Sequence, residues 1–288
     1  FSIGQRTKLR SKKLKFSNIS IIDTSSIKNN GKNLPKHKES IDIIVCVHNA
    51  LDDVKTCLDS LLKHSTDPFS IIIIDDGSEE NTKNYLELFA RNNNQVILIR
   101  NNDAKGYTRA ANIGLHKSLS SVKVLLNSDT IVGPEWLDRM YRAIESDTKI
   151  GIAGPLSNTA SWQSIPQLEK NGDWANNPLP PSITVEKMSR IISKYSGCIY
   201  PEVPLLNGFC LMIKKEVIDD IGYLDDENFG QGYGEEDDFN IRAGKAGWKK
   251  IIVDDVYVFH AQSKSYSHET RYQLSNQNSK KLDRKSVV

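Results

Sequence analysis

The stretch Val122-Lys123-Val124-Leu125-Leu126-Asn127-Ser128-Asp129 is an apolar strand that ends abruptly in a polar cluster with one carboxylate at its tip. In an open α/β sheet, ligands bind just beyond the carboxyl ends of the strands. Two more strand-like runs end in the same way, since residues 71–74 precede Asp75-Asp76-Gly77-Ser78 and residues 256–259 precede His260. A carboxylate in a cleft is costly unless it is solvated, paired or bound to a cation. These three strand ends predict a site for a metal and a phosphorylated ligand.

Outward from this strand, apolar runs alternate with amphipathic segments. The run Ile41-Asp42-Ile43-Ile44-Val45-Cys46-Val47 is rich in β-branched residues, as buried parallel strands are. Alternation of this kind implies parallel strands joined by right-handed crossovers. We therefore expect an α/β fold with a mostly parallel central sheet flanked by helices. The expected elements are strands over 41–47, 71–74, 96–99 and 122–126, and helices over 51–62, 82–91 and 107–118.

The alternation ends after a further helix, which we expect to begin at Gly133-Pro134 because Pro favours a first turn. Residues 155–204 are rich in Pro, Asn and Ser and predict a long irregular segment, which in a compact domain is usually a lid or a binding loop. The expected elements after it are a strand over 209–213, a helix over 215–221, a glycine-rich loop over 230–234, an acidic helix that Gly247 ends, and strands over 251–253 and 256–259.

The net charge of +2 is unevenly distributed along the 288 residues. Residues 1–40 hold ten Lys or Arg against two Asp or Glu, a balance of +8, so the remainder carries −6. We expect a basic arm or linker over 1–40, one domain over 41–265, and a polar basic tail over 266–288. The arm either contacts anionic lipid at a membrane surface or is a solvated tether. The acidic remainder argues against nucleic acid as the main partner.

The sequence shows neither a signal peptide nor an apolar run near the ~20 residues that a membrane helix needs. Four cysteines, Cys46, Cys57, Cys198 and Cys210, lack the close paired spacing of a zinc knuckle or a disulfide framework. This use of cysteine fits a reducing, cytoplasmic setting.

Each polar strand end also has a simpler structural explanation. Asn, Ser and Asp are common turn formers, so Asn127-Ser128-Asp129 is either a metal-binding element or a turn. Asp75 either accepts a hydrogen bond from a nucleobase N–H or belongs to a turn in which Ser78 or Asn81 caps the next helix. His260 is either a ligand or a satisfied core residue, and the carboxylates at the other strand ends favour the ligand.

The acidic run Glu235-Glu236-Asp237-Asp238 follows the glycine-rich loop at the start of a helix. Acids there interact favourably with the helix dipole, and Asp238 forms an i,i+4 pair with Arg242, so part of the run is explained by structure. Four adjacent carboxylates also repel, which can raise the pKa of one of them into the range of a general base. Arg109 either meets a base or phosphate or is solvated.

Together these motifs resemble the family 2 glycosyltransferases with a GT-A fold, and in particular bacterial polysaccharide and rhamnosyl-type transferases. The resemblance covers Ile41 to about Ser265. The matching segments are Ile43-Ile44-Val45-Cys46-Val47-His48-Asn49, Ile74-Asp75-Asp76-Gly77-Ser78, Asn127-Ser128-Asp129, Asn207-Gly208-Phe209, Gly234-Glu235-Glu236-Asp237-Asp238-Phe239 and His260. The Gln-X-X-Arg-Trp element of a processive synthase is absent, so the resemblance implies single or limited sugar addition.

In that family the first strand end and the Asp-Asp-Gly-Ser turn hold the nucleotide, which implies a nucleotide-binding half over 41–130 and an acceptor-binding half over 131–265. The implied nucleotide-binding residues are Val47, His48, Asn49, Asp75, Asp76, Arg109, Asn127 and Ser128. The Asp-X-Asp-like element binds metal and pyrophosphate. Here Asn127 replaces its first acid, which leaves Asp129 with the metal contact and His260 as the second ligand.

The acidic element after the glycine loop supplies the catalytic base in that family. Its Glu-Asp-like pair places the base at Glu236, with Asp237 as the rival. We also expect Glu235 and the loop around Asn207-Gly208 to contact the sugar or the acceptor, and the aromatic character of Trp162 and Trp174 makes them candidates to stack on it.

The resemblance implies an inverting displacement. Glu236 takes the proton from an acceptor hydroxyl, whose oxygen attacks the anomeric carbon from the face opposite the nucleotide, while Mn²⁺ or Mg²⁺ stabilises the departing diphosphate. The expected donor is a UDP-sugar, with dTDP or GDP as alternatives. The expected acceptor is a glycan or a lipid-linked glycan in surface polysaccharide synthesis, at the inner face of the membrane.

Three alternatives stay open at the level of sequence. A sugar nucleotidyltransferase would carry a Gly-rich, Arg/Lys-bearing loop after the first strand, where this chain has His48-Asn49-Ala50-Leu51. A phospho-acceptor receiver domain is much shorter and would leave the late acidic element without a role. A catalytically inactive sugar-binding module would keep the fold, although Asp129, Glu236 and His260 argue against it.

Overall fold

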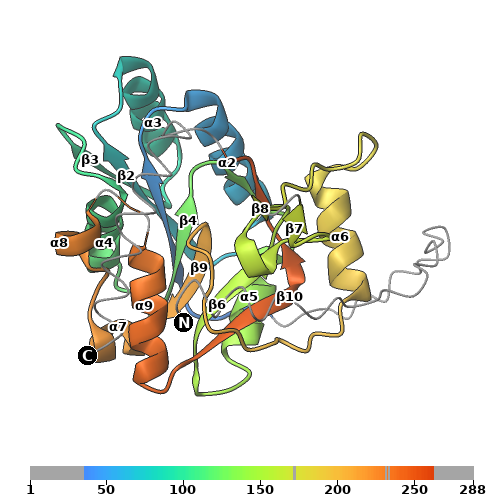
Figure 1. Cartoon of the computed structure of the whole chain (residues 1–288). Helices are drawn as coiled ribbons and strands as arrows, with labels where there is room; N and C mark the ends of the chain where they lie inside the picture. The colour runs from blue at the N-terminus through green and yellow to red at the C-terminus, as the bar shows by residue number, and fades with distance from the viewer. Residues whose placement is uncertain (1–35, 171–172, 231, 233, 263–288) are drawn as a thin grey trace.

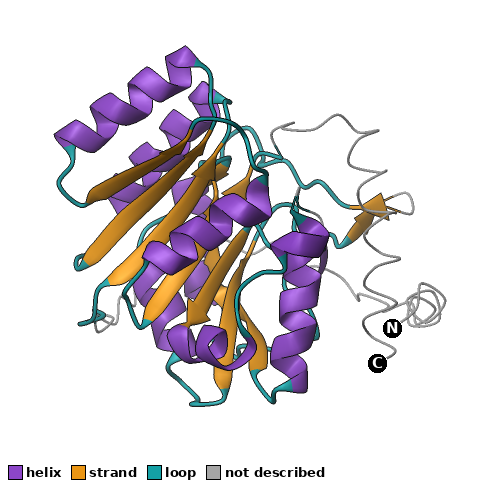
Figure 2. Cartoon of the chain, turned by 90° about the vertical axis from the view of Figure 1, so that its left-hand side faces the viewer, coloured by secondary structure: helices purple, strands orange, loops and turns teal. Residues whose placement is uncertain are grey.

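A computed structural model of the protein describes residues 36–170, 173–230, 232 and 234–262. Its centre is a seven-stranded sheet in the order β10-β6-β9-β4-β1-β2-β3, with helices on both faces (Figures 1 and 2). The strands are β1 (Ile41–Val47), β2 (Phe69–Asp76), β3 (Val96–Asn101), β4 (Val122–Asn127), β6 (Ile150–Leu156), β9 (Cys210–Lys214) and β10 (Lys249–Tyr257). Within this described sheet only β9 runs antiparallel to its neighbours, β4 and β6. The expected mostly parallel α/β sheet is confirmed.

The alternation predicted for the first half is confirmed. The connecting helices are α2 (Leu51–His64), α3 (Glu80–Asn92) and α4 (Tyr107–Lys117). Side chains of β1 alternate between the two faces, so Ile43 and Val45 pack with α2 and α3 while Ile44 packs with α4. Full burial of each such side chain contributes about 1.5–3 kcal/mol, which makes the sheet the main source of stability.

The second half adds the helices α5 (Trp136–Ile144), α7 (Lys215–Ile221), α8 (Asp226–Phe229) and α9 (Glu235–Lys245). Apolar residues of α2, α3 and α5 cover one face of the sheet, and those of α4, α7 and α9 cover the other. The helix expected from Gly133-Pro134 begins two residues later, at Trp136. The packing of α9 on the sheet fixes the position of the acidic run at its first turn.

The segment expected to be irregular over 155–204 contains more structure than its composition predicts. Strand β6 runs into it, and it holds the short helix η2 (Ser161–Gln163), the hairpin β7 (Glu169–Lys170) and β8 (Asp173–Trp174), and helix α6 (Val185–Tyr195). The sequence hides β6 because Gly151, Gly154 and Pro155 interrupt its apolar pattern. Gly151 is needed there, since a Cβ would lie 2.5 Å from Val217.

The two strands expected over 251–253 and 256–259 are mainly one strand, β10. The interpretation of two strands was wrong because Asp254-Asp255 looks like a break. Asp255 is instead buried, and its carboxylate pairs with Arg139 (2.9 Å) and Arg142 of α5. A charge removed from water is tolerated when such partners replace the solvent.

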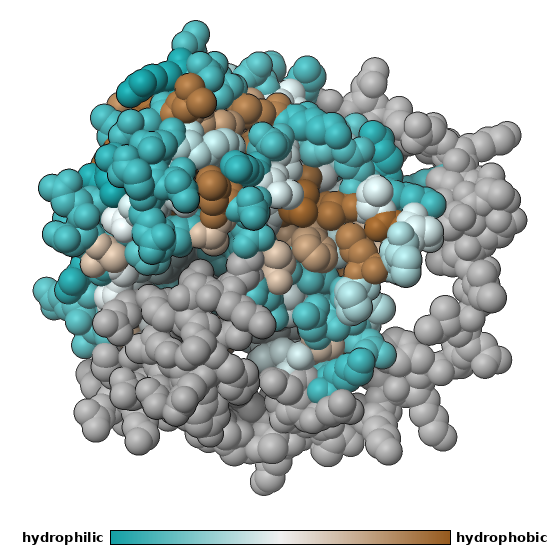
Figure 3. All heavy atoms as spheres, turned by 90° about the horizontal axis from the view of Figure 1, so that it is seen from above, coloured by the Kyte–Doolittle hydropathy of each residue, from teal (hydrophilic) through white to brown (hydrophobic). Residues whose placement is uncertain are grey.

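Most of the predicted basic arm and all of the tail over 266–288 lie outside the described residues, so the domain boundaries stay predictions. Among the described helices, none combines the length and the apolar character needed to cross a bilayer. All four cysteines are free, and Cys57 and Cys210 are buried. Seen from above, the surface is mainly hydrophilic, with apolar side chains exposed in patches (Figure 3).

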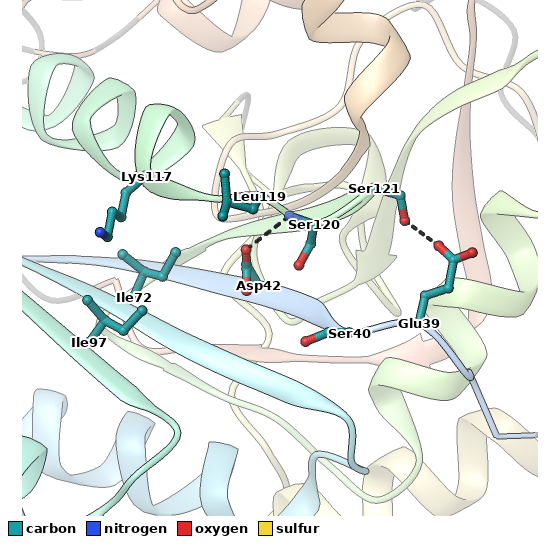
Figure 4. Close-up of a pocket in the computed structure, with 9 residues that line it drawn as sticks. All are labelled: Glu39, Ser40, Asp42, Ile72, Ile97, Lys117, Leu119, Ser120 and Ser121. Carbon is teal, nitrogen blue, oxygen red and sulfur yellow. Dashed lines mark hydrogen bonds between the residues drawn. The ribbon is translucent and has the colours of Figure 1, made fainter.

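A hollow of about 590 Å³ lies near the amino end of β1 (Figure 4). Asp42, the second residue of β1, contributes to its wall and accepts hydrogen bonds from the Ser118 hydroxyl (2.7 Å) and the Ser120 amide (3.3 Å). Ile97 and Leu119 line it from β3 and from the end of α4. This hollow is at the amino end of β1, whereas the predicted site residues follow the carboxyl ends of the strands.

Candidate active site

The carboxyl ends of the central strands meet at one edge of the sheet. Val47 is in register with Asp75, Asp75 with Arg100, and Cys46 with Asn127. Seven of the residues predicted to bind the nucleotide therefore come together at this edge: Val47, His48, Asn49, Asp75, Asp76, Asn127 and Ser128. The arrangement follows from parallel strands of similar length that start level with one another.

Asp75 is fully buried at the end of β2. Its Oδ1 accepts a hydrogen bond from the Ser78 amide (3.0 Å), and its Oδ2 pairs with Arg100. Arg100 also donates to the Ser78 carbonyl (2.8 Å). Both carboxylate oxygens of Asp75 thus have protein partners, and a nucleotide base would reach this pair through Arg100, whose side chain is 26% exposed. Arg100 is a site residue that the sequence analysis missed, although its place at the end of β3 beside an acidic strand end is a usable signal.

The other residues of this edge hold two loops in place. The Asp76 carboxylate accepts hydrogen bonds from the Asn101 side chain (2.7 Å) and from the amides of Lys105 (2.9 Å) and Gly106 (2.8 Å). The Asn49 side chain accepts from the Glu79 amide (2.8 Å). The His48 ring lies 2.8 Å from the Asp76 carbonyl, and it is exposed at the edge. These contacts give Asp76 and Asn49 defined structural tasks at the rim of the predicted nucleotide site.

The predicted metal ligands are adjacent. Oδ1 of Asp129 lies 3.4 Å from Nε2 of His260, and both side chains are largely buried. A small antiparallel ladder of β5 (Thr130–Ile131) and β11 (Phe259–His260) joins them, with Thr130 opposite His260. The Ala261 amide also donates to the Asp129 carbonyl (2.9 Å). The ladder therefore brings together residues that lie more than a hundred positions apart in the sequence.

The surroundings of His260 orient its ring for a ligand. Nδ1 faces the Thr159 carbonyl at 3.3 Å and Nε2 faces Asp129 at 3.4 Å, so the tautomer with its proton on Nδ1 would leave Nε2 available to a cation. The His260 backbone is held by the Asn158 side chain at both its amide (2.8 Å) and its carbonyl (2.9 Å). A carboxylate and an imidazole form a donor set that fits Mn²⁺ and tolerates Mg²⁺.

In the part of the chain that the structure describes, no group of three or more His, Cys, Asp or Glu side chains could hold a metal. Asp129 and His260 would therefore supply two ligands and leave the other positions to water or to a phosphorylated ligand. Such incomplete protein coordination is usual for cations that act together with a bound diphosphate.

Glu236 lies in the first turn of α9 and is half-buried. Its Oε2 accepts a hydrogen bond from the Gly234 amide (3.1 Å). Gly234 has φ of 114°, a conformation that glycine adopts without strain. Burial, and then repulsion from Asp237, raise the pKa of Glu236 to about 7. A carboxylate with this pKa is suited to accept a proton near neutral pH.

Glu235, the preceding residue, is 5% exposed, and its Oε2 has no hydrogen-bond partner among the described residues. Burial, and then repulsion from Glu236, raise the pKa of Glu235 well above its usual value. An acid whose pKa is higher in the folded than in the unfolded chain binds more protons when folded. Its ionisation therefore destabilises the fold as the pH rises above the unfolded pKa.

We expect Glu235→Gln to stabilise the protein at pH 8 by on the order of 1–3 kcal/mol and to change stability little at pH 4, because the amide removes the buried charge but keeps the shape. Urea unfolding at the two pH values measures this difference. Glu216→Gln, an exposed acid on α7, is the matched control. A Glu235→Gln effect of equal size at both pH values would contradict the explanation.

The dipeptide Gly208-Phe209 connects the base to the metal pair. A Cβ on Gly208 would lie 3.3 Å from Cβ of Glu236, so this backbone is in close contact with the base. The Phe209 ring stacks on the ring of His260 with centroids 5.3 Å apart and an angle of 18°. Adjacent residues of one loop thus contact the two predicted functional elements, which places Glu236 and the Asp129–His260 pair at the same edge.

Two buried amides that the sequence analysis missed hold this loop. Gln163 accepts a hydrogen bond from the Asn207 amide (2.7 Å) and donates to the Pro155 carbonyl (2.7 Å). Asn240 pairs with both the amide (3.2 Å) and the carbonyl (3.1 Å) of Leu206, and it donates to the Glu236 carbonyl (2.7 Å). Both side chains are fully buried. A polar residue on an otherwise core-facing helix position, such as Asn240 beside Phe239, is the signal that could have found one of them.

We expect Asn240→Ala to reduce the free energy of unfolding by about 2–4 kcal/mol, because it leaves the buried amide and carbonyl of Leu206 without partners. Chemical denaturation measures the loss. Asn94→Ala, at an exposed position, should change stability by no more than about 0.5 kcal/mol. A loss in Asn240→Ala no larger than in this control would show that the amide does not hold the loop.

The remaining predicted residues lie farther out. Arg109 is exposed and lies 3.9 Å from the Asp226 carboxylate of α8. Trp162 on η2 and Trp174 on β8 are both exposed and contact each other edge to face, with centroids 5.8 Å apart. Asn207 reaches η2 through a 3.5 Å contact with the Ser161 hydroxyl. The structure therefore brings Trp162, Asn207 and Gly208 to one side of Glu236 and leaves Arg109 beside α8.

The fold is that of a GT-A-type glycosyltransferase. Its sheet carries acids at the strand ends, His260 lies near the end of the described chain, and α9 begins with an acidic run. The family model described as "Glycosyl transferase family 2" matches residues 42–222, and the chain belongs to this family.

The fold is also similar to a mannosyltransferase from Pyrobaculum calidifontis in complex with GDP-Man and Mn²⁺, with TM-score 0.62, 17% identity, and coverage of 86% of this chain and 65% of that one. It is similar to GalNAc-T7 with UDP, GalNAc and Mn²⁺, with TM-score 0.61, 22% identity, and coverage of 77% and 43%.

Curated relatives agree with this assignment. An uncharacterized glycosyltransferase of Haemophilus influenzae is 25% identical over 142 residues, which cover 48% of this chain and 44% of that protein. The poly-beta-1,6-N-acetyl-D-glucosamine synthase of Staphylococcus aureus strain MSSA476 is 26% identical over 188 residues, which cover 65% of this chain and 42% of that protein. The match spans less than half the length of each of these two relatives.

Proposed function

We propose that the chain is a metal-dependent, inverting and non-processive glycosyltransferase. It would move a sugar from a nucleotide-diphosphate sugar to a hydroxyl group of a glycan or lipid-linked acceptor in surface polysaccharide synthesis. The observation that carries the proposal is the contact of one dipeptide, Gly208-Phe209, with both Glu236 and His260. A base for the acceptor and a cation site for the diphosphate then lie within one reaction centre. Family membership favours glycosyl transfer over nucleotidyl transfer.

In this mechanism Asp75 and Arg100 position the base of the nucleotide, and the turn after β4 faces its diphosphate. Mn²⁺ or Mg²⁺ held by Asp129 and His260 would neutralise the charge that develops on the leaving diphosphate. Glu236, whose pKa is about 7, accepts the proton of the acceptor hydroxyl, so the oxygen gains the electron density to attack the anomeric carbon. The hydrogen bond from the Gly234 amide orients the carboxylate during this transfer.

We propose a UDP-sugar as the donor, as the family resemblance implies. The alternatives are dTDP- and GDP-sugars. The neighbours with bound UDP and GDP-Man support a nucleotide-sugar donor of this general kind. The location proposed for the reaction is the cytoplasmic face of a membrane, with the basic segment over 1–40 in contact with anionic lipid.

Calorimetric titration with UDP, dTDP and GDP, each with and without Mn²⁺, tests the proposal. We expect one nucleotide to bind, and to bind more tightly when Mn²⁺ is present. Incubation of that nucleotide's sugar donors with the protein should then release free nucleotide diphosphate slowly and only with metal. If no nucleotide binds under any of these conditions, the proposal fails and the alternative of an inactive sugar-binding module is favoured.

A further inference from the structure

We propose that Trp162 and Trp174 form a platform for a pyranose ring of an oligosaccharide acceptor, which makes the acceptor a glycan chain rather than a single small alcohol. The inference rests on the proposed function, since it names the acceptor class of the same site. Trp162 is 46% exposed and Trp174 is 43% exposed. Single exposed apolar side chains are common, but two exposed indoles in contact form a contiguous apolar patch of the kind that marks interaction sites.

Both indoles are held in place by loops that also build the site. Trp162 belongs to η2, where the next residue, Gln163, is buried and binds the Asn207 amide at 2.7 Å. Trp174 belongs to the β7–β8 hairpin, whose base is closed by a hydrogen bond from the Ala175 amide to the Leu168 carbonyl (3.0 Å). Trp162 is thus fixed relative to the loop that carries Gly208, which contacts Glu236, and Trp174 packs against Trp162.

A second connection runs from the hairpin to the metal pair. The Asn177 side chain donates to the carbonyls of Asn158 (2.8 Å) and Gln167 (2.9 Å). The Asn158 side chain in turn holds the backbone of His260. One hydrogen-bonded chain therefore links the Trp174 hairpin to His260.

The chemistry of the surface fits a neutral sugar better than a membrane. The apolar C–H face of a pyranose packs against an aromatic ring, while its hydroxyl groups need donors and acceptors at the rim. Gln167 and Asn176, which are exposed in the same segment as Trp162 and Trp174, carry amide side chains of this kind. Between Ser161 and Asn177 the sequence holds one lysine against two acids, whereas surfaces that bind anionic lipid are rich in Lys and Arg.

Binding of neutral tetrasaccharides of glucose, galactose, mannose and N-acetylglucosamine, followed by tryptophan fluorescence without donor or metal, tests the platform. We expect one of them to bind and to change the emission of the exposed indoles. Trp162→Ala and Trp174→Ala should each weaken its binding by about 3- to 10-fold, as expected for loss of one aromatic stacking contact. Tyr195→Ala, an aromatic residue of similar exposure (44%) on α6, is the control and should leave binding unchanged.

The inference is overturned if no tetrasaccharide binds the wild-type protein, or if both tryptophan variants bind as tightly as the control. Binding of phosphatidylglycerol vesicles that the two tryptophan variants lose, with no effect of the saccharides, would also overturn it and assign the indoles to a membrane. Because the assay uses neither donor nor metal, its result is separate from the nucleotide titration. Saccharide binding without nucleotide binding would contradict the proposed function but support the saccharide site at Trp162 and Trp174.

Discussion

Glu236→Gln is expected to lose sugar transfer by about 100- to 10,000-fold, because the amide cannot accept the proton of the acceptor hydroxyl. Nucleotide binding should change little, since Gln retains the size of Glu and none of the predicted nucleotide contacts lies on α9. The measurement is the transfer rate with the donor nucleotide identified by titration. Glu227→Gln makes the same chemical change at an exposed position on α8 and should retain full activity.

The pH profile separates proton transfer from a merely structural effect. The pKa of Glu236 is raised to about 7, so the fraction able to act as a base grows as the pH rises from 6 to 8. The wild-type transfer rate should increase over this range, whereas the residual rate of Glu236→Gln should show no such increase. If Asp237→Asn instead loses both the activity and its increase with pH, while Glu236→Gln keeps both, the catalytic base is Asp237.

Asp129→Ala is expected to abolish the Mn²⁺-dependent part of nucleotide binding. Asp129 supplies the one carboxylate of the proposed pair. Removal of a residue that only hydrogen-bonds to a metal ligand lowers metal affinity by about 10- to 100-fold, and removal of the ligand Asp129 should lower it further. Calorimetry of the nucleotide with and without Mn²⁺ measures it. Binding without metal should be unchanged, because the contacts proposed for the nucleotide base do not include Asp129.

Two controls accompany this variant. Asp59→Ala removes an exposed carboxylate from α2 and should leave metal-dependent binding intact. His260→Ala should reduce the same metal-dependent binding as Asp129→Ala, since the two side chains lie 3.4 Å apart. Unaltered Mn²⁺ dependence in Asp129→Ala would remove this pair from the proposed metal site.

The first half of the fold could be predicted because its signals are local. The runs that became β1, β2 and β4 are almost purely apolar, and the amphipathic segments between them are regular, so period and length decide the assignment. Strand β6 was missed because Gly151 and Gly154 weaken the pattern, and what requires Gly151 is the approach of Val217 from a distant helix. Tertiary packing of this kind leaves no trace in the local sequence.

The candidate site divides in a similar way. The strand-end acids, the acidic helix start and His260 carry a signal in their residue types, and the structure brings Asp129 next to His260. Gln163 carries none, and Asn240 carries only the signal of a polar residue next to the core residue Phe239, since a buried amide has the same sequence appearance as an exposed one until its partners at Asn207 and Leu206 are known. The sequence therefore indicates candidate chemical groups more readily than the buried amides that hold the loops in place.

On heating, this protein should stop working before it melts. The ladder that joins Asp129 to His260 is two residues long on each strand, whereas the seven-stranded sheet buries two large apolar clusters. Short ladders open locally at a lower free-energy cost than a whole core. Inactivation of this kind would be reversible on cooling, because the seven-stranded sheet stays folded and holds β5 and β11 close enough to pair again. A divalent cation that binds the closed ladder would delay it by mass action, so the working temperature would depend on metal supply.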